Sequence, residues 1–382
     1  MTDSLPRVIP VTGTAWAPFE PLAEILGRVV ADQGAGGAAL VVYRDGRPVV
    51  DLAAGDYAPD GIQAVFSVSK AVSAIAVAML HADGVLDLDA PLGSYWPAFA
   101  KPSTATITTR DVLAHRSGLA VISAPLSLAQ LLAGEAETAL ETQEPLWVPG
   151  TRHGYHSFTF GPLLDGVVRR ATGRDVASHV RERIAEPLGA EFWLGLPDEL
   201  HPRVRQVRFV ETLLTPHQAD RIRAGLVHPD AGVDTLLGHP QSFNTPEVLR
   251  SSWPSASGTA TAHGLARIMA ATLGTVDGVR LLDASARDAM RATRSRGDDA
   301  ILGIPIHLGS GVQLPFPQFP MLGPGSYGHE AAGGSVAFAD TETGLAIGFT
   351  TDVFPHMHGG SRQFAALLPT IRHLLEADPS TV

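Results

Sequence analysis

Ser67 and Lys70 stand three residues apart at the start of an apolar segment. If that segment is a helix, one turn brings the two side chains onto the same face, where they can share a proton. An uncharged amine beside a serine hydroxyl can remove its proton while the oxygen attacks a carbonyl carbon. The pair therefore predicts a serine nucleophile with a lysine as its general base.

The base role requires that Lys70 lose its charge near neutral pH, whereas a free lysine has a pKa of about 10.4. A serine and a lysine at this spacing are more often a helix cap and a solvated cation. Residues 69–82, however, are apolar almost all round, which predicts a buried helix and a desolvated amine. Moreover, of the chain's 28 cations only Lys70 and Lys101 are lysine, and arginine cannot lose its proton in a protein.

Residues 149–157 form a glycine-punctuated loop that presents Tyr155 at its tip. A phenol held near a cation can pass a proton to a leaving group or accept one from a serine. A loop tyrosine by itself is more often a packing residue. Tyr155 is therefore a candidate proton relay only in combination with Ser67 and Lys70.

Residues 327–335 form a run of small side chains at the start of a strand-like segment. Small residues let a substrate approach the backbone closely. Backbone N–H groups of this run could supply one half of an oxyanion hole, with the N–H of Ser67 as the other half. A glycine-rich bend in a sheet is the alternative interpretation.

No metal and no cofactor is expected. His329-Glu330 lacks the second histidine of a zinc-protease motif, because Gly333 stands at that position. Two further histidine pairs have the spacing of metal ligands but no evident third ligand: His153/His156 and His356/His358.

Hydrophobic periodicity predicts the elements that must position these groups. Ranges 39–43 and 48–52 are strand-like, and Asp45-Gly46 between them tolerates positive φ in a hairpin turn. Thr108 opens a short helix with a capping-box pattern. Further helices are expected over residues 18–33, 69–82, 159–171, 175–186, 261–273 and 361–377, and further strands over 335–339 and 345–350.

Residues 197–254 mix arginine, histidine and proline with little periodicity, which predicts loops and short elements lining a cleft. Trp253 at the end of this region is expected to shape the substrate pocket. No evident linker divides the chain, so an interface between two lobes is the expected place for a site.

The composition bounds the class of protein. The chain has 382 residues, 45% of them hydrophobic, which is enough for a large core. Its formal net charge of −11 makes nucleic acids and anionic membranes poor partners and favours a small-molecule ligand. The absence of cysteine excludes disulfides and thiolate nucleophiles. The start of the chain lacks a signal-peptide pattern, and the longest apolar run, residues 71–80, is too short for a membrane span, so a cytoplasmic protein is expected.

The three motifs, in this order, resemble those of serine hydrolases with the β-lactamase and penicillin-binding-protein fold. That family carries S-x-x-K, then Y-x-N or S-x-N, then K-T-G or H-x-G. Class C β-lactamase-like esterases, the family VIII carboxylesterases, look like the nearest branch. The resemblance covers residues 18–375, and residues 113–119 look like the family's L-L-x-H-x-S-G-L stretch.

The resemblance implies an α+β, β-lactamase/transpeptidase-like fold, in which helices flank an antiparallel sheet and a helical lobe is inserted. The α/β lobe would come from residues 1–66 and 238–382, and the mainly helical lobe from residues 67–237. The site would lie between the lobes.

The resemblance also implies roles for particular residues. Ser67 would be the nucleophile, Lys70 the general base and Tyr155 the proton relay. The backbone N–H groups of Ser67 and Ala332 would form the oxyanion hole. His329 would stand near Tyr155 and the substrate.

The second and third motifs depart from the lactamase pattern. Ser157 stands where lactamases use asparagine, from where it can hydrogen-bond Lys70. The third motif reads His329-Glu330-Ala331 and has no lysine to hold a β-lactam carboxylate. Ser157, His329 and Trp253 are therefore expected to bind substrate, and an ester is favoured over a β-lactam.

The leading prediction is a serine esterase that hydrolyses small carboxylic esters through an acyl-enzyme on Ser67. Transfer of the acyl group to an alcohol or amine is one alternative. A β-lactamase, D-amino-acid peptidase or amidase on the same site is another, and a scaffold without turnover is the least favoured. The sequence leaves the natural ester and the oligomeric state open.

Overall fold

The computed structural model of the chain describes residues 9–33, 36–58, 60–123, 126–209, 240–354 and 362–377. Much of the region expected to be loops and short elements, residues 210–239, lies outside the described residues, as do His356 and His358.

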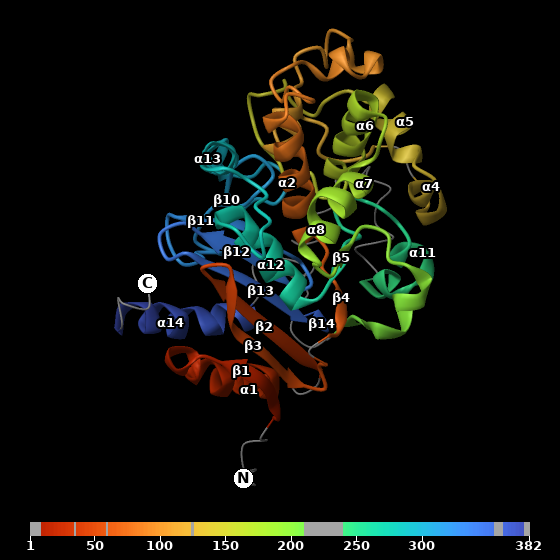
Figure 1. Cartoon of the computed structure of the whole chain (residues 1–382). Helices are drawn as coiled ribbons and strands as arrows, with labels where there is room; N and C mark the ends of the chain where they lie inside the picture. The colour runs from red at the N-terminus through yellow and green to blue at the C-terminus, as the bar shows by residue number, and fades with distance from the viewer. Residues whose placement is uncertain are drawn as a thin grey trace.

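A six-stranded antiparallel sheet, in the order β1-β3-β2-β13-β12-β11, forms the centre of the α/β part (Figure 1). Three of its strands come from the start of the chain and three from the end, so the sheet joins both terminal regions. The helical middle of the chain is an insertion between β3 and β11. The strands are β1 Val11–Ala15, β2 Gly37–Arg44, β3 Arg47–Gly55, β11 Ser326–Glu330, β12 Val336–Asp340 and β13 Leu345–Thr351.

The expected hairpin is present as β2 and β3. Asp45 and Gly46 at its turn both have positive φ, 49° and 74°, as a tight two-residue turn requires. Both strands are longer than the apolar runs, because the hydrogen-bonded ladder continues through Arg44 and Arg47. β2 is central in the sheet and buried along almost its whole length.

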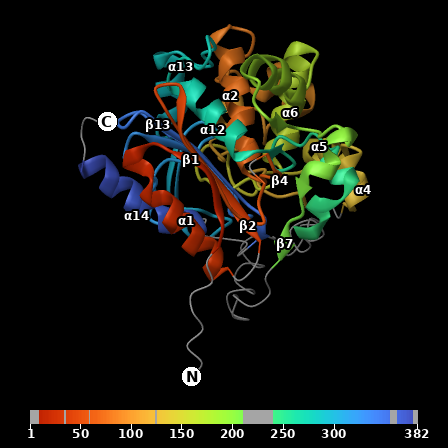
Figure 2. The same cartoon turned by 60° about the horizontal axis from the view of Figure 1, so that its bottom comes forward.

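Helices cover both faces of this sheet. α1, Pro21–Asp32, and α14, Arg362–Ala377, pack side by side on one face and close an apolar core with the sheet (Figures 1 and 2). α12, Ala262–Leu273, lies across β2, β12 and β13 on the opposite face. These three helices confirm the helical segments expected from periodicity, with their ends within three residues of the expected ones.

α2, Val68–Ala82, runs from beside the sheet into the helical lobe (Figure 1). Most of its residues are buried, in agreement with its apolar sequence. The other helices of this part and of its border with the sheet are α3 Thr109–Leu113, α4 Leu128–Leu132, α5 Glu135–Thr142, α6 Phe160–Thr172, α7 Val176–Val180, α8 Glu186–Leu188, α11 Pro246–Leu249 and α13 Ala284–Arg291.

The single helix expected over residues 175–186 is instead three consecutive pieces. A π-helical turn, Arg181–Ala185, separates α7 from α8. Pro187 lacks the N–H that a regular helix would use at this place, and a wider turn accommodates the missing hydrogen bond. Sequence periodicity does not report such a change of pitch within a helical segment.

Several strands were missed because they are short or polar. They form small sheets and ribbons around the large one: β4 Ile62–Ala64, β5 Phe192–Trp193, β6 Val204–Arg205, β7 Arg208–Phe209, β8 Thr259–Ala260, β9 Ser295–Asp298, β10 Pro305–Leu308 and β14 Val353–Phe354. β11 was also missed as a strand, since its sequence is polar and glycine-bearing. The lobe boundaries at residues 66/67 and 237/238 stay a prediction. Of the helices in the described ranges, none combines the length and hydropathy needed to cross a bilayer.

Candidate active site

Ser67 lies at the N-terminal end of α2, where the chain turns sharply into the helix. Phe66 before it has a positive φ of 46°, which is rare for a bulky side chain and marks a strained backbone. The turn leaves Ser67 partly exposed, whereas Phe66 and Val68 on either side of it are buried. The local backbone therefore presents the Ser67 hydroxyl from an otherwise closed surface.

Lys70 is fully buried, and its amine has three oxygen neighbours. Nζ lies 3.1 Å from Ser67 Oγ, 2.9 Å from the carbonyl oxygen of Ser157 and 2.8 Å from that of Ser255. Burial holds the pKa of Lys70 well below its usual value, because desolvation disfavours the charged form. In the described part of the chain no carboxylate forms an ion pair with this amine.

This arrangement fits an uncharged amine. A neutral amine has two hydrogens and one lone pair, and the two carbonyls can each accept one hydrogen. The lone pair is then left for the hydroxyl hydrogen of Ser67. The geometry is therefore that of a base poised beside its proton donor.

Tyr155 is the third member of the cluster. Its ring lies 5.0 Å from Lys70 Nζ. Burial raises the pKa of Tyr155, and the nearby Ser67 hydroxyl opposes the shift. The phenol therefore stays protonated at neutral pH and can donate to an oxygen near Ser67. Asp299 fixes this loop, because its carboxylate accepts a hydrogen bond from the Tyr155 N–H at 3.0 Å.

His329, on β11, closes the cluster from the sheet side. Its Nε2 lies 3.4 Å from the Tyr155 hydroxyl, and its Nδ1 contacts the carbonyl oxygen of Glu330. Burial lowers the pKa of His329 to about 3, and the nearby Lys70 adds to the shift. The ring is therefore neutral, with the hydrogen on Nδ1 and an acceptor lone pair on the nitrogen that faces Tyr155.

The two backbone donors expected for an oxyanion hole are both free. Within the described residues neither the Ser67 N–H nor the Ala332 N–H donates a hydrogen bond to protein. Ala332 lies in the turn between β11 and β12, which a hydrogen bond from Ala331 N to Ser335 O closes. Free N–H groups at these two positions are available to a developing oxyanion.

Phe66 and Gly333 bring the two candidate oxyanion donors together, because one precedes Ser67 and the other follows Ala332. A Cβ atom on Gly333 would lie 2.4 Å from Cε2 of Phe66, so only glycine fits against the ring. The ring itself is held by Phe243 and Phe354, with centroid distances of 4.4 and 5.4 Å. The turn that carries Ala332 is therefore set against the residue that precedes the nucleophile.

We expect Gly333→Ala to lower kcat at least about tenfold, because the new methyl group must displace either Phe66 or the Ala332 turn. The measurement is steady-state hydrolysis of a p-nitrophenyl ester. Gly274→Ala is the matched control, since a Cβ there meets no atom within 4 Å and the backbone is extended. Equal activity of the two variants would contradict the proposed contact.

Two buried histidines, His115 and His156, pack and hydrogen-bond against the loop that carries Tyr155. His156 Nδ1 lies 2.6 Å from the Gly154 carbonyl oxygen and its Nε2 lies 2.6 Å from Ser117 Oγ. His115 accepts a hydrogen bond from the His156 N–H, and its ring lies 4.8 Å from that of Tyr155. Burial lowers the pKa of His156 to about 4 and that of His115 well below its usual value.

These shifts predict acid sensitivity. His156 and His329 have pKa values of about 4 and about 3 in the folded protein, against about 6.5 in an unfolded chain. Below pH 6.5 the unfolded state therefore binds protons first, so stability is full above this pH and is lost as the pH falls toward 4. Each histidine contributes roughly 1 kcal/mol per pH unit. Urea unfolding between pH 8 and 4 measures the slope, and His156→Gln should reduce it; an unchanged slope would speak against the assignment.

Ser157 and Trp253 are the other two residues expected to bind substrate. The side chain of Ser157 does not hydrogen-bond Lys70; its backbone carbonyl does. Sequence alone could not distinguish the two, because any residue at this position would offer the carbonyl. Trp253 packs edge-on against Phe158, and within the described residues no hydrogen bond or ring contact joins it to Ser67, Lys70 or Tyr155. Its part in substrate binding stays a prediction.

Sequence reasoning missed several residues that build the site. Ser255 contributes only a carbonyl oxygen, which no residue type announces. The strained Phe66 carries no sequence signal either, since it is neither glycine nor asparagine. His115 did have a signal, because it lies in the stretch that resembles a family motif, but its place under Tyr155 was not predicted. In the described ranges there is no cluster of three or more potential metal ligands.

Fold and cluster together define a serine hydrolase with a serine, lysine and tyrosine at its centre. Residues 22–368 match the β-lactamase family, and the chain belongs to it. The family resemblance predicted from the three motifs is thereby confirmed.

The chain is also similar to individual proteins over most of its length. The chain is 32% identical over 336 residues to the esterase/β-lactamase LipL of Mycobacterium tuberculosis, covering 82% of this chain and 76% of that protein. It is similar to the structure of EstA from Arthrobacter nitroguajacolicus Rue61a, with a TM-score of 0.84, 30% identity and coverage of 95% and 98% of the two chains. A family VIII carboxylesterase matches with a TM-score of 0.85 and 24% identity over 96% of this chain and 100% of that chain, which shows a shared fold.

Proposed function

We propose that the protein is an esterase that hydrolyses small carboxylic esters through a covalent acyl-enzyme on Ser67. The observation that carries the proposal is the buried Lys70 amine, 3.1 Å from Ser67 Oγ, with two carbonyls as its other partners. The names of LipL and EstB, an esterase of Burkholderia gladioli that is 30% identical over 168 residues, support the substrate class.

In the first half-reaction Ser67 Oγ attacks the ester carbonyl while its proton moves to Lys70 Nζ. The carbonyl oxygen becomes an oxyanion between the N–H groups of Ser67 and Ala332. Collapse of this intermediate breaks the bond to the alcohol oxygen. Tyr155 donates the proton that the leaving alkoxide needs and is reprotonated from Lys70, so an alcohol leaves and an acyl-enzyme remains.

In the second half-reaction water attacks the acyl carbonyl. The same groups act in reverse: the proton of the water passes to Lys70, either directly or through Tyr155, which gives its own proton to Lys70 as it accepts the one from water, and Lys70 then protonates Ser67 Oγ as it leaves. His329 Nε2, 3.4 Å from the Tyr155 hydroxyl, accepts the phenol hydrogen when no substrate oxygen does. An alcohol or amine in the place of water would make the same site an acyltransferase.

Tyr155→Phe should lower kcat about 100-fold or more while the protein stays folded, because the ring is retained and only the proton relay is lost. The variant is assayed by steady-state ester hydrolysis, with circular dichroism to verify the fold. Tyr95→Phe is the matched control, since the Tyr95 hydroxyl contacts only the Asp87 N–H in the described structure. Near-normal turnover of Tyr155→Phe would remove the tyrosine from the mechanism.

A β-lactam is the second candidate substrate class, because LipL is called both an esterase and a β-lactamase. The third motif argues against it for this chain. A β-lactam carries a carboxylate, which lactamases hold with the lysine of the third motif. His329 stands at that motif position in this chain, and it is uncharged at neutral pH because burial lowers its pKa to about 3. A neutral ring offers that carboxylate no opposite charge.

A substrate panel separates the candidates. It contains p-nitrophenyl esters of increasing acyl length, a chromogenic cephalosporin and an ester with an added alcohol as acyl acceptor. Faster turnover of a short ester than of the cephalosporin supports the proposal. Preference for the cephalosporin, or no turnover of any ester together with no labelling of Ser67 by a fluorophosphonate, would contradict it. The small-molecule partner and the cytoplasmic location stay predictions.

A further inference from the structure

The loop that follows β9, residues 299–304, closes on itself around the carboxylate of Asp299. This side chain is buried, and its Oδ1 accepts hydrogen bonds from the N–H groups of Ile301 and Leu302, at 2.9 and 2.8 Å. The backbone closes the same loop, because the Asp299 N–H donates to the carbonyl of Ile304 at 3.0 Å. Its own hydrogen bonds therefore fix the conformation of this segment, which we call the Asp299 loop.

The Asp299 loop contacts three successive residues of the loop that carries Tyr155. The Ala300 N–H donates to the carbonyl of His153 at 3.0 Å, and Asp299 Oδ1 accepts from the Tyr155 N–H at the same distance. A Cβ atom on Gly154, between them, would lie 2.8 Å from a side chain of the Asp299 loop. The Asp299 loop therefore sets the position of the Tyr155 backbone, although 144 residues separate Asp299 from Tyr155 in the sequence.

The second carboxylate oxygen of Asp299 has no hydrogen-bond partner among the residues that the structure describes, and it is buried. A buried charged oxygen without a hydrogen bond costs stability. Its negative charge does act on Tyr155: burial chiefly raises the pKa of the phenol, and the charge of Asp299 adds to that shift. Asp299 therefore holds the backbone of Tyr155 and also favours its protonated phenol.

Both effects bear on the step in which Tyr155 gives up its proton. In the proposed mechanism the phenol O–H bond breaks as its proton moves to the departing alkoxide, and Lys70 returns to Tyr155 the proton that it took from Ser67. A proton donor must lie within hydrogen-bond distance of the oxygen that it protonates, and a displacement of about 1 Å can cost a factor of about 100 in rate. An alkyl alcohol needs this proton in order to leave, whereas p-nitrophenol leaves as a stable anion.

We propose that Asp299 is a positioning residue for Tyr155, and that it determines which leaving groups the protein can expel. Esters of alkyl alcohols depend on it, because their hydrolysis requires a correctly placed proton donor. Esters of p-nitrophenol depend on it much less. This inference rests on the proposed function, since Asp299 acts through the relay role of Tyr155.

The test compares two esters of the same acid, ethyl butyrate and p-nitrophenyl butyrate. The measured quantity is kcat/KM, which reports the half-reaction in which the alcohol leaves. We expect Asp299→Ala to lower kcat/KM about 30-fold for ethyl butyrate and no more than about threefold for p-nitrophenyl butyrate. An equal loss on both esters would show a merely structural role and would overturn the proposal.

A conservative variant and a substitute variant complete this test. Asp299→Asn keeps an oxygen that can accept the Tyr155 N–H, so it should stay within about fivefold of the wild-type protein on both esters. Activity of Asp299→Asn as low as that of Asp299→Ala would contradict the role of this acceptor. If Asp299→Ala does not fold, Ile301→Ala replaces it, because it removes the side chain against Gly154, and the same selective loss on ethyl butyrate is expected.

A double-mutant cycle shows whether Asp299 acts through Tyr155. The relay is absent in Tyr155→Phe, so the addition of Asp299→Ala should lower kcat/KM for ethyl butyrate by no more than about twofold further. Two losses that multiply would overturn the proposal and leave the relay role of Tyr155 intact. Normal hydrolysis of ethyl butyrate by Tyr155→Phe alone would instead refute the relay itself, and with it this part of the proposed function.

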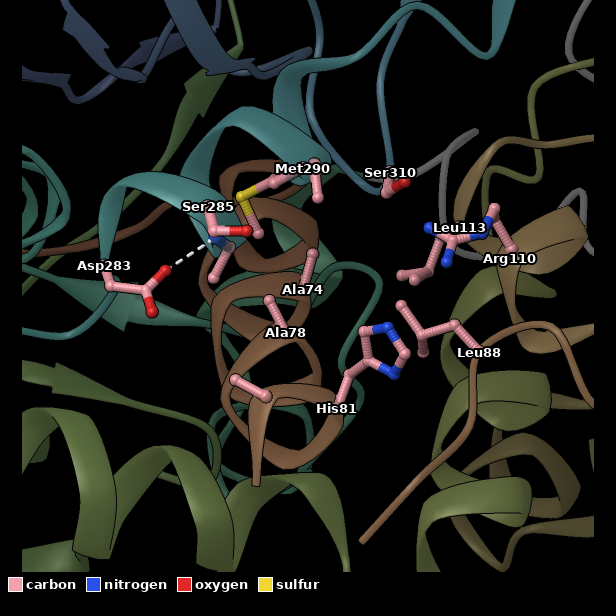
Figure 3. Close-up of a pocket in the computed structure, with 13 residues that line it drawn as sticks. Ala74, Ala78, His81, Leu88, Arg110, Leu113, Asp283, Ser285, Met290 and Ser310 are labelled. Atoms are coloured by element: carbon pink, nitrogen blue, oxygen red, sulfur yellow. Dashed lines mark hydrogen bonds between the residues drawn. The ribbon is translucent and has the colours of Figure 1, made fainter. Parts of the chain in front are cut away.

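Asp283→Ala is the matched control. Asp283 lies at the edge of the groove between α2 and α13, where its carboxylate accepts the Ala286 N–H at 2.7 Å (Figure 3). It thus makes the same kind of contact as Asp299, a carboxylate with a backbone N–H, but at the start of another helix. Asp283→Ala should leave kcat/KM unchanged for both esters, and a selective loss on ethyl butyrate in this variant would contradict the assignment to Asp299.

Discussion

Replacement of Ser67 by alanine should reduce ester hydrolysis by at least about 10⁴-fold. The variant keeps the helix, the buried lysine and both free N–H groups, and it loses only the oxygen that bonds to the acyl carbon. Residual activity above the uncatalysed rate would come from binding and the oxyanion donors. The measurement is the rate of p-nitrophenyl ester hydrolysis, together with the mass of the protein after treatment with a fluorophosphonate.

Ser73→Ala is the matched control for this experiment. Ser73 lies on the same helix and is also buried, but its hydroxyl pairs with the carbonyl of Pro254 at 3.2 Å. We expect this variant to keep its turnover and its labelling, with a loss of stability of about 1 kcal/mol. Ester hydrolysis by Ser67→Ala at the rate of this control would show that another residue is the nucleophile.

Replacement of Lys70 by arginine should reduce hydrolysis at least about 10³-fold. Arginine keeps a positive charge and several donors but cannot become neutral, so it cannot accept the proton of Ser67. The variant separates the base role of Lys70 from a purely electrostatic one. The measurement is the pH profile of kcat/KM together with the burst of acyl-enzyme formation.

The pH profile of the wild-type protein also tests the role of Lys70 as the general base. Because burial holds the pKa of Lys70 well below its usual value, activity should rise with pH as the amine loses its proton, at a lower pH than a free lysine would require. This acid limb should disappear in Lys70→Arg, together with the activity.

Lys101→Arg provides the control, since Lys101 is exposed and is the other lysine of the chain. It should leave turnover unchanged. Because the guanidinium is larger than the amine and the site is closed, Lys70→Met serves as a second variant of similar size, and thermal unfolding verifies that both proteins fold. High activity in either Lys70 variant would disprove the lysine as base.

Family and fold class could be predicted from the sequence because short motifs report local geometry. Ser67 and Lys70 share a face in any helix that starts at this point, and the apolar residues after them indicate that the helix is buried. The β2–β3 hairpin was equally predictable, since Asp45-Gly46 fits a turn with two positive φ values. β11 was not, because its polar, glycine-bearing sequence lacks the alternation of a strand.

The sequence by itself determined which side chains could react and how the nearest of them are spaced. Only the tertiary structure decided that Lys70 meets the carbonyls of Ser157 and Ser255, which lie 87 and 185 residues further along the chain. It also decided that the Ala332 N–H has no acceptor among the residues that the structure describes and that Gly333 closes on Phe66. The physical reason is that every residue carries a carbonyl and nearly every residue an N–H, so no residue type marks the ones that folding brings to a site.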